Sequence, residues 1–142
     1  MEPDAKDLVL AEEDRRELVR WSVACVERLL PLFAAERPHD RRLSEALQGA
    51  LAFADSQLTV GPVRQLAFGC HAAARDASSP SATAAARACG QAVAIAHMAG
   101  HSRQVAPYTA KALTGPARDL ELDWQRAHLP TRFLVYVYGQ TG

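Results

Sequence analysis

An alanine-rich run at positions 80–99 constrains the fold of this chain more than any other sequence feature. Wound into a helix, the run is apolar nearly all round. Helices of this kind are usually buried at the centre of a bundle. Gly90 and Ala94, one helical turn apart, are small enough to let a neighbouring element approach closely. The run therefore predicts a central helix that is surrounded by other helices.

Apolar residues at helical spacing also occur on both sides of this run, between prolines, glycines and polar turns. In the segment 12–30, Trp21 and Cys25 lie on the apolar stripe of an amphipathic helix, which Pro31 should kink or end. Further helices are expected at 40–54, 62–76, 102–113 and 115–129. The pattern predicts an all-α fold, a single-domain antiparallel bundle of five or six helices.

Asp40 and Arg42 belong to the polar turn that precedes the second expected helix. Asp40 is a suitable residue to cap the N-terminus of that helix, because its carboxylate can accept hydrogen bonds from free backbone N–H groups. We interpret Asp40 as structural. Arg42 fits an exposed helix start and a buried ion pair with Asp40 equally well.

A chain of 142 residues fits one domain and can bury a core without a disulfide or a metal. We place this domain at 12–138, with an N-terminal tail at 1–11 and a C-terminal tail at 139–142. The segment 132–138 is rich in aromatic residues and valine, which favour strands. Because one strand has no pairing partner in a helical domain, we expect a short helix or an irregular packing arm there. An exposed arm could join two copies in a homodimer.

The charge balance and the absence of targeting signals indicate a cytoplasmic protein. The net charge is zero, whereas nucleic-acid binders usually carry a basic excess. The first residues are acidic, unlike a signal peptide, and no apolar run is long enough to span a membrane. The three cysteines include no CxxC pair and fit buried free thiols in a reducing compartment. We therefore expect neither nucleic acid nor a membrane as a partner.

The segment 61–118 is basic within this neutral chain, since it holds six basic side chains and one acid, Asp76. Four of its arginines are candidates for binding an anionic partner: Arg64, Arg75, Arg87 and Arg103. Arg75 and Arg87 flank the loop at 78–80, where the N-terminus of the central helix could help to hold a phosphate or a carboxylate. The segment predicts an anionic partner, but it contains no strong catalytic signature.

Three histidines in the same segment suggest an alternative. His97 and His101 are four residues apart and share a face if one helix carries both, which is a metal-ligand spacing. His71 on the preceding helix could add a third ligand, as in the metal-dependent DinB-like bundles, which this arrangement would resemble. The protein would then be a hydrolase or a metal sensor. However, Met98 stands where a His-Glu-x-x-His motif has its glutamate, and ordinary core histidines explain the same pattern.

Several phrases of the sequence match one bacterial family. They are RWSVACVERLLPLF at 20–33, PHDRR at 38–42, CHAAAR at 70–75 and AAARACGQAVA at 84–94, followed by His97, His101, Tyr108 and Trp124–Gln125. In these positions the chain resembles the immunity-five-like proteins of bacterial polymorphic toxin systems, from about residue 15 to residue 133.

The resemblance implies an all-helical domain that neutralises a cognate protein toxin by binding it. It implies no catalytic residues and no cofactor. In this hypothesis the basic arginines meet an acidic surface of the toxin, or enter an anion-binding active site. The metal-binding bundle remains the alternative hypothesis at this point.

Overall fold

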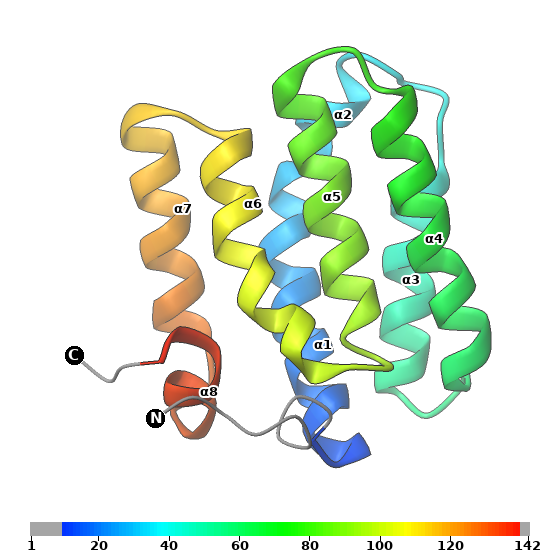
Figure 1. Cartoon of the computed structure of the whole chain (residues 1–142), viewed down its shortest axis with the longest axis vertical. Coiled ribbons are helices and arrows are strands. Elements are labelled where there is room, and N and C mark those ends of the chain that lie inside the picture. Colours follow the sequence, from blue (N-terminus) through cyan, green and yellow to red (C-terminus); the bar gives the residue numbers. More distant parts are fainter. Residues whose placement is uncertain (1–9, 140–142) are drawn as a thin grey trace.

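Helices are the only regular structure in the part of the chain that the computed structural model describes, residues 10–139. In chain order they are α1 (Glu12–Val26), α2 (Leu30–Ala34), α3 (Arg42–Ala54), α4 (Val60–Asp76), α5 (Pro80–Ala94), α6 (Val105–Ala112), α7 (Gly115–His128) and α8 (Leu134–Tyr138). Three 3-10 segments connect them: η2 (Glu27–Leu29), η3 (Ala99–Gln104) and η4 (Thr131–Phe133). The predicted all-α fold is confirmed (Figure 1). None of these helices is long and apolar enough to cross a membrane.

Of the two tails expected from the sequence, residues 1–9 and 140–142 lie outside the described range. Within that range, the first helix begins at Glu12 and the last ends at Tyr138.

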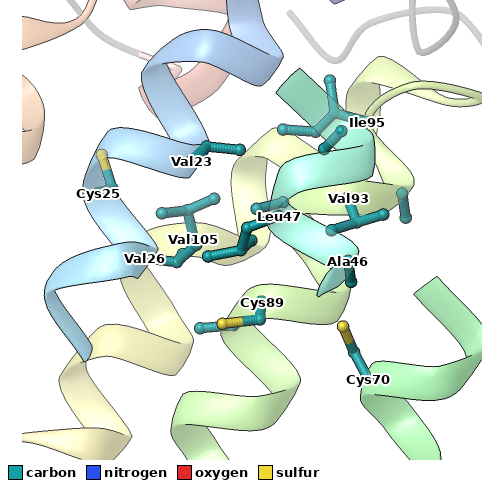
Figure 2. Packing of buried hydrophobic residues seen from close by; sticks show 14 of the residues in the cluster. Val23, Cys25, Val26, Ala46, Leu47, Cys70, Cys89, Val93, Ile95 and Val105 are labelled. Atoms are coloured by element: carbon teal, nitrogen blue, oxygen red, sulfur yellow. The ribbon is translucent and has the colours of Figure 1, made fainter. Parts of the chain in front are cut away.

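Helix α5 lies at the centre of the bundle, as its alanine-rich sequence predicts. It packs against α1, α2, α3, α4 and α6, and most of its residues are buried. Figure 2 shows Cys89 and Val93 of α5 in one apolar cluster with Val26 of α1 and Leu47 of α3. Removing this apolar surface from water stabilises the fold by about 25 cal/mol per Å². The small alanine side chains allow several helices to pack around one.

The central helix begins where it was predicted to begin but ends earlier. Ser79 caps it, because the Ser79 Oγ accepts the backbone N–H of Ala82 at 3.1 Å. At the other end, the backbone tightens to i→i−3 hydrogen bonds at Ile95 and Ala96, and the chain leaves the helical conformation at Met98. The prediction that one helix extends to residue 99 is therefore wrong, and His97 lies beyond its end.

Other helix boundaries differ from the prediction by a few residues. Helix α1 passes into the η2 segment, and the chain resumes an α-helix with Pro31 in its first turn, where a missing N–H costs little. Helix α4 starts at Val60, before Pro62. The N-cap of α3 is Arg41 rather than Asp40, although Asp40 still accepts the Arg42 backbone N–H at 3.1 Å.

The C-terminal segment forms the short helix α8, one of the two forms expected for it. Phe133 and Val137 are buried against the rest of the domain, at 3% and 8% exposure. Val135 remains 56% exposed. The apolar side chains of this arm thus mostly complete the core of their own chain.

Candidate functional site

The arginines fall into two groups according to whether a carboxylate lies beside them. Outside α4, α5 and α6 many form ion pairs, such as Arg28 with Glu121 at 2.7 Å and Arg20 with Asp55 at 3.2 Å. By contrast, no acid occurs in the segment 77–118. Among the described residues, four cations of α4, α5 and α6 form no ion pair with a carboxylate: Arg64, Arg75, Arg87 and Lys111.

The outer side of α4 presents two of these cations around an exposed aromatic ring. Arg64, Phe68 and Arg75 share one side of the helix, because their spacings of four and seven residues are close to whole turns. The Phe68 side chain is 52% exposed, and the Arg64 guanidinium carbon lies 5.9 Å from its ring centroid. Aromatic and arginine side chains are enriched among the residues that dominate protein interfaces, so this pair is a candidate contact for a partner.

Sequence reasoning missed Phe68, whose only signal is its position. It stands opposite the apolar stripe of Val63, Ala67 and Cys70, which packs into the core. Recognising it requires knowing that nothing covers that side of α4.

Arg87 of α5 approaches this surface through His71 of α4. The Arg87 Nη1 lies 2.9 Å from the His71 Nδ1 and donates to it, which requires the neutral imidazole. Burial, followed by the charge of Arg87, lowers the pKa of His71 below its ordinary 6.5. Because His71 lies between Phe68 and Arg75 along α4, we group Arg64, Phe68, Arg75 and Arg87 as the basic face.

Gly90 makes room for the histidine in this arrangement. A Cβ atom added to Gly90 would lie 2.7 Å from the His71 Cε1 and 2.8 Å from its Nε2, closer than such atoms can pack. The neighbour that Gly90 admits is therefore an imidazole ring. Through His71, the missing side chain of Gly90 helps to position Arg87.

The loop at 78–80 already holds an anion from the chain itself. The two carboxylate oxygens of Glu36 accept the backbone N–H groups of Ser78 and Ser79, each at 2.7 Å. These bonds lower the pKa of the Glu36 carboxyl. The backbone N–H groups of Ser78 and Ser79 are therefore occupied, which limits the help that this loop can give in holding a phosphate or a carboxylate. Arg75 and Arg87 remain as side-chain donors.

Arg103 serves a different purpose from the other three candidate arginines. Its Nε donates to the backbone carbonyl of Tyr136 at 2.7 Å, and its guanidinium carbon lies 4.5 Å from the Tyr136 ring centroid. The side chain therefore links η3 to α8. Its Nε is engaged within the chain, and we therefore do not group Arg103 with the basic face.

The three histidines lie near one another but do not form a metal site. His97 and His101 contact edge to face, with ring centroids 5.3 Å apart, and the His101 Nδ1 lies 2.7 Å from Gln91 Oε1. The Nδ1 of His71 is taken by Arg87, whose positive charge opposes a cation. Residues 10–139 contain no group of three or more His, Cys, Asp or Glu side chains that could hold a metal ion. The metal-binding alternative is thus left without a geometric basis.

A family model covers residues 8–132 of this chain, and its description is "Imm-5 like putative immunity protein". The chain belongs to this immunity family. The resemblance noted from the sequence is confirmed, and membership implies a cognate toxin as the partner. No curated protein and no solved structure matches the chain.

The cysteines of this immunity-family domain are packing residues. Cys25, Cys70 and Cys89 are buried free thiols. Burial raises the pKa of the Cys70 thiol to about 12 and also raises the pKa values of the other two. A thiol that stays protonated is a poor nucleophile.

Trp21, one turn before Cys25, also has a structural role. Its indole N–H donates to the backbone carbonyl of Gln125 at 2.8 Å and so joins α1 to α7.

Asp40 and Arg42 form a structural corner of the same domain. The Arg42 Nη2 donates to Asp40 Oδ2 at 2.6 Å and to Asp76 Oδ2 at 2.8 Å, and so ties the start of α3 to the end of α4. The Nε of Arg37 adds a bond to Asp40 at 3.3 Å. These bonds, those from Arg42 first, lower the pKa of Asp40 to about 2. We refer to Arg37, Asp40, Arg42 and Asp76 as the Asp40 corner.

Proposed function

We propose that this immunity-family chain neutralises its cognate toxin by direct binding through the basic face, without a reaction of its own. The observation that carries the proposal is the exposed Phe68, held between cations that have no carboxylate partner within residues 10–139. Aromatic and arginine side chains contribute most of the energy of typical protein interfaces. The basic face presents both.

The charge of the face favours an acidic toxin surface, or a toxin active site that binds an anion. Arg64 and Arg75 need not leave an internal ion pair before they meet a carboxylate of the toxin. Complementary charge speeds the encounter and disfavours partners of the wrong charge. Phe68 would then anchor the complex by losing its contact with water. The toxin would be inactivated by occlusion.

The internal chemistry of the domain supports binding rather than catalysis. Its thiols are held protonated, and a ring nitrogen of His71 and one of His101 are bonded to Arg87 and Gln91. A nucleophile or a general base needs a reactive group within reach of a substrate. None of these groups combines a suitable pKa with an open position.

Charge reversal on α4 tests the proposal. We expect Arg75→Glu to weaken toxin affinity at least about tenfold, and the double variant Arg64→Glu/Arg75→Glu to weaken it about a hundredfold, in isothermal titration calorimetry. The matched control is Arg41→Glu, which makes the same charge change at a side chain that is 78% exposed at the N-cap of α3.

The control should bind within about threefold of the wild type, since Arg41 is a solvent-exposed charge outside the basic face and pairs only with the exposed Glu45. Protection of cells that express the toxin should be lost in the same order. If the double variant binds and protects as well as Arg41→Glu does, the basic face is not the interface.

A further inference from the structure

A pocket of about 660 Å³ opens between the first turns of α5 and the end of α6. The two helices lie side by side in the bundle (Figure 1). The lining residues are Ser78, Pro80, Thr83, Ala84, Arg87, Tyr108 and Lys111. The volume is within the range of sites that accept a bound side chain or a small ligand.

The lining combines two cations with an apolar wall. Arg87 and Lys111 carry the positive charge, and the Lys111 ammonium lies 4.9 Å from the Tyr108 ring centroid. Pro80 and Ala84 contribute apolar surface, and no carboxylate lines the pocket. Such a site suits a carboxylate that is attached to an apolar body.

The backbone offers the pocket little help in holding an anion. The N–H groups of Ser78 and Ser79 are already bonded to Glu36, so the charge of a ligand must be met by side chains. Arg87 gives one N–H to His71, and no other hydrogen bond of Arg87 occurs among residues 10–139. The remaining N–H groups of its planar fork match a carboxylate. A phosphate, which is more highly charged, would lack the cradle of backbone donors that usually holds it.

Arg87 connects this pocket to the basic face. On one side it contacts His71, which lies between Phe68 and Arg75 along α4, and on the other it lines the pocket. A partner that covers the basic face therefore has the pocket at the edge of the same surface. An extended segment of that partner can reach both.

We infer that this pocket receives an acidic residue adjoining a large apolar residue, from an extended segment of the toxin. The inference rests on the proposed function and adds a second contact point to it. Lys111 and Arg87 meet the carboxylate of that segment, while Tyr108, Pro80 and Ala84 contact the apolar side chain. The pocket thus selects for a short acidic and apolar sequence in the partner.

Two variants test the pocket separately from α4. Lys111→Glu reverses a charge at an exposed position, and Thr83→Trp fills the space without a charge change. Each should weaken toxin affinity about tenfold in calorimetry, with Arg41→Glu again as the control for charge reversal. Lys111→Gln should weaken it less than Lys111→Glu. The thermal unfolding midpoint of each variant shows whether it has folded.

The pattern of results separates the two proposals. If Arg64→Glu/Arg75→Glu abolishes binding while Lys111→Glu and the folded Thr83→Trp bind normally, the pocket is not a contact and the basic face stands. If neither the α4 variants nor the pocket variants change toxin affinity, both proposals are wrong. If toxin affinity falls both in the α4 variants and in the pocket variants, the result supports the pocket as a second contact.

A synthetic probe tests the chemistry without the toxin. We expect N-acetyl-Phe-Asp-amide to shift the amide NMR signals of Thr83, Ala84 and Lys111 in the full chain. N-acetyl-Phe-Asn-amide, which lacks the charge, and inorganic phosphate should not shift them. Equal shifts with the neutral peptide, or larger shifts with phosphate, would overturn the assignment of an apolar carboxylate.

Discussion

The Asp40 corner and the basic face meet on α4 and use arginine for opposite purposes. At the end of α4, Asp76 pairs with Arg42 at 2.8 Å, whereas its neighbour Arg75 has no carboxylate beside it among the described residues. The corner holds the ends of α3 and α4 together. In the face, Arg87 contacts His71, but Arg64 and Arg75 form no ion pair with a described residue.

The difference shows that the position of the acids, more than the number of arginines, decides which part of the surface can attract an anionic partner. Arginines whose charge is met inside the chain contribute to folding and have little left to offer a partner. Arginines without an internal carboxylate contribute little to folding and keep their attraction for an external one. A neutral chain can in this way carry a strongly basic surface.

The largest expected effect is on folding at the corner. Asp40→Ala removes an acceptor for the Arg42 backbone N–H and leaves the Arg37 and Arg42 guanidinium groups without that carboxylate. We expect the free energy of unfolding to fall by about 2 kcal/mol in urea denaturation. Arg75→Ala should change it by less than about 0.5 kcal/mol. If both variants lower the free energy of unfolding equally, the corner and the face do not differ in their contribution to folding.

The next effect is on binding at the face. Phe68→Ala should weaken toxin affinity about tenfold, or about 1.4 kcal/mol, while the urea midpoint stays near that of the wild type. Leu120→Ala is the matched control, because Leu120 is 70% exposed on α7 and lies outside the face. Both variants remove an exposed apolar side chain. Similar affinities for the two would mean that Phe68 is an ordinary exposed residue.

A smaller effect is expected where the face meets the core. Gly90→Ala should push the His71 ring away from Arg87, while alanine gains about 1 kcal/mol of helix propensity over glycine. The cost of displacing the ring and the gain in helix propensity largely offset each other. The free energy of unfolding should therefore change by less than about 1 kcal/mol. The pKa of His71, measured by NMR titration, should rise toward 6.5 as the ring leaves its buried site.

Gly69→Ala provides the control, since a Cβ at Gly69 meets nothing within 4 Å. It should leave the pKa of His71 unchanged and show the gain in helix propensity alone. An unchanged pKa in Gly90→Ala as well would mean that the ring does not depend on Gly90.

The smallest effect is a dependence of stability on pH that differs between the two regions. Burial lowers the pKa values of His71, His97 and His101 from 6.5, so the folded state binds fewer protons than the unfolded state. Their contribution is complete above pH 6.5 and is lost as the pH falls from there toward the lowered values. The Asp40 contribution is lost only between pH 3.8 and about 2.

Urea midpoints measured from pH 8 downward should therefore decline in two steps. His71→Gln should reduce the first step and leave the second, whereas Asp40→Asn should do the reverse. If the urea midpoint falls in a single step that both variants affect equally, the pH dependence of stability does not differ between the two regions.

The sequence was sufficient for the class of fold and for the central position of α5, because alanine on all sides of a helix requires cover on all sides. It misplaced the end of that helix, since Ile95 and Ala96 are as apolar as the residues before them. After this turn, η3 and α6 pack back against α5. That information is not local to the segment.

The candidate site was predictable only in part, for the same reason. The scarcity of acids in the segment 61–118, where Asp76 is the only one, is visible in the sequence. The engagement of Arg103 by Tyr136 is not, because 33 residues separate them. The histidine spacing suggested a metal because it assumed one continuous helix, which ends before His97.

The hydrogen bonds from the loop at 78–80 to Glu36 should reduce the binding of small anions to this surface. The loop carries its own counter-ion, so inorganic phosphate and free nucleotides find its backbone donors already satisfied. Small anions therefore cannot use these two N–H groups, which precede the helix start. The arginines beside the loop stay available to a ligand that brings apolar surface along with its charge, as a protein does.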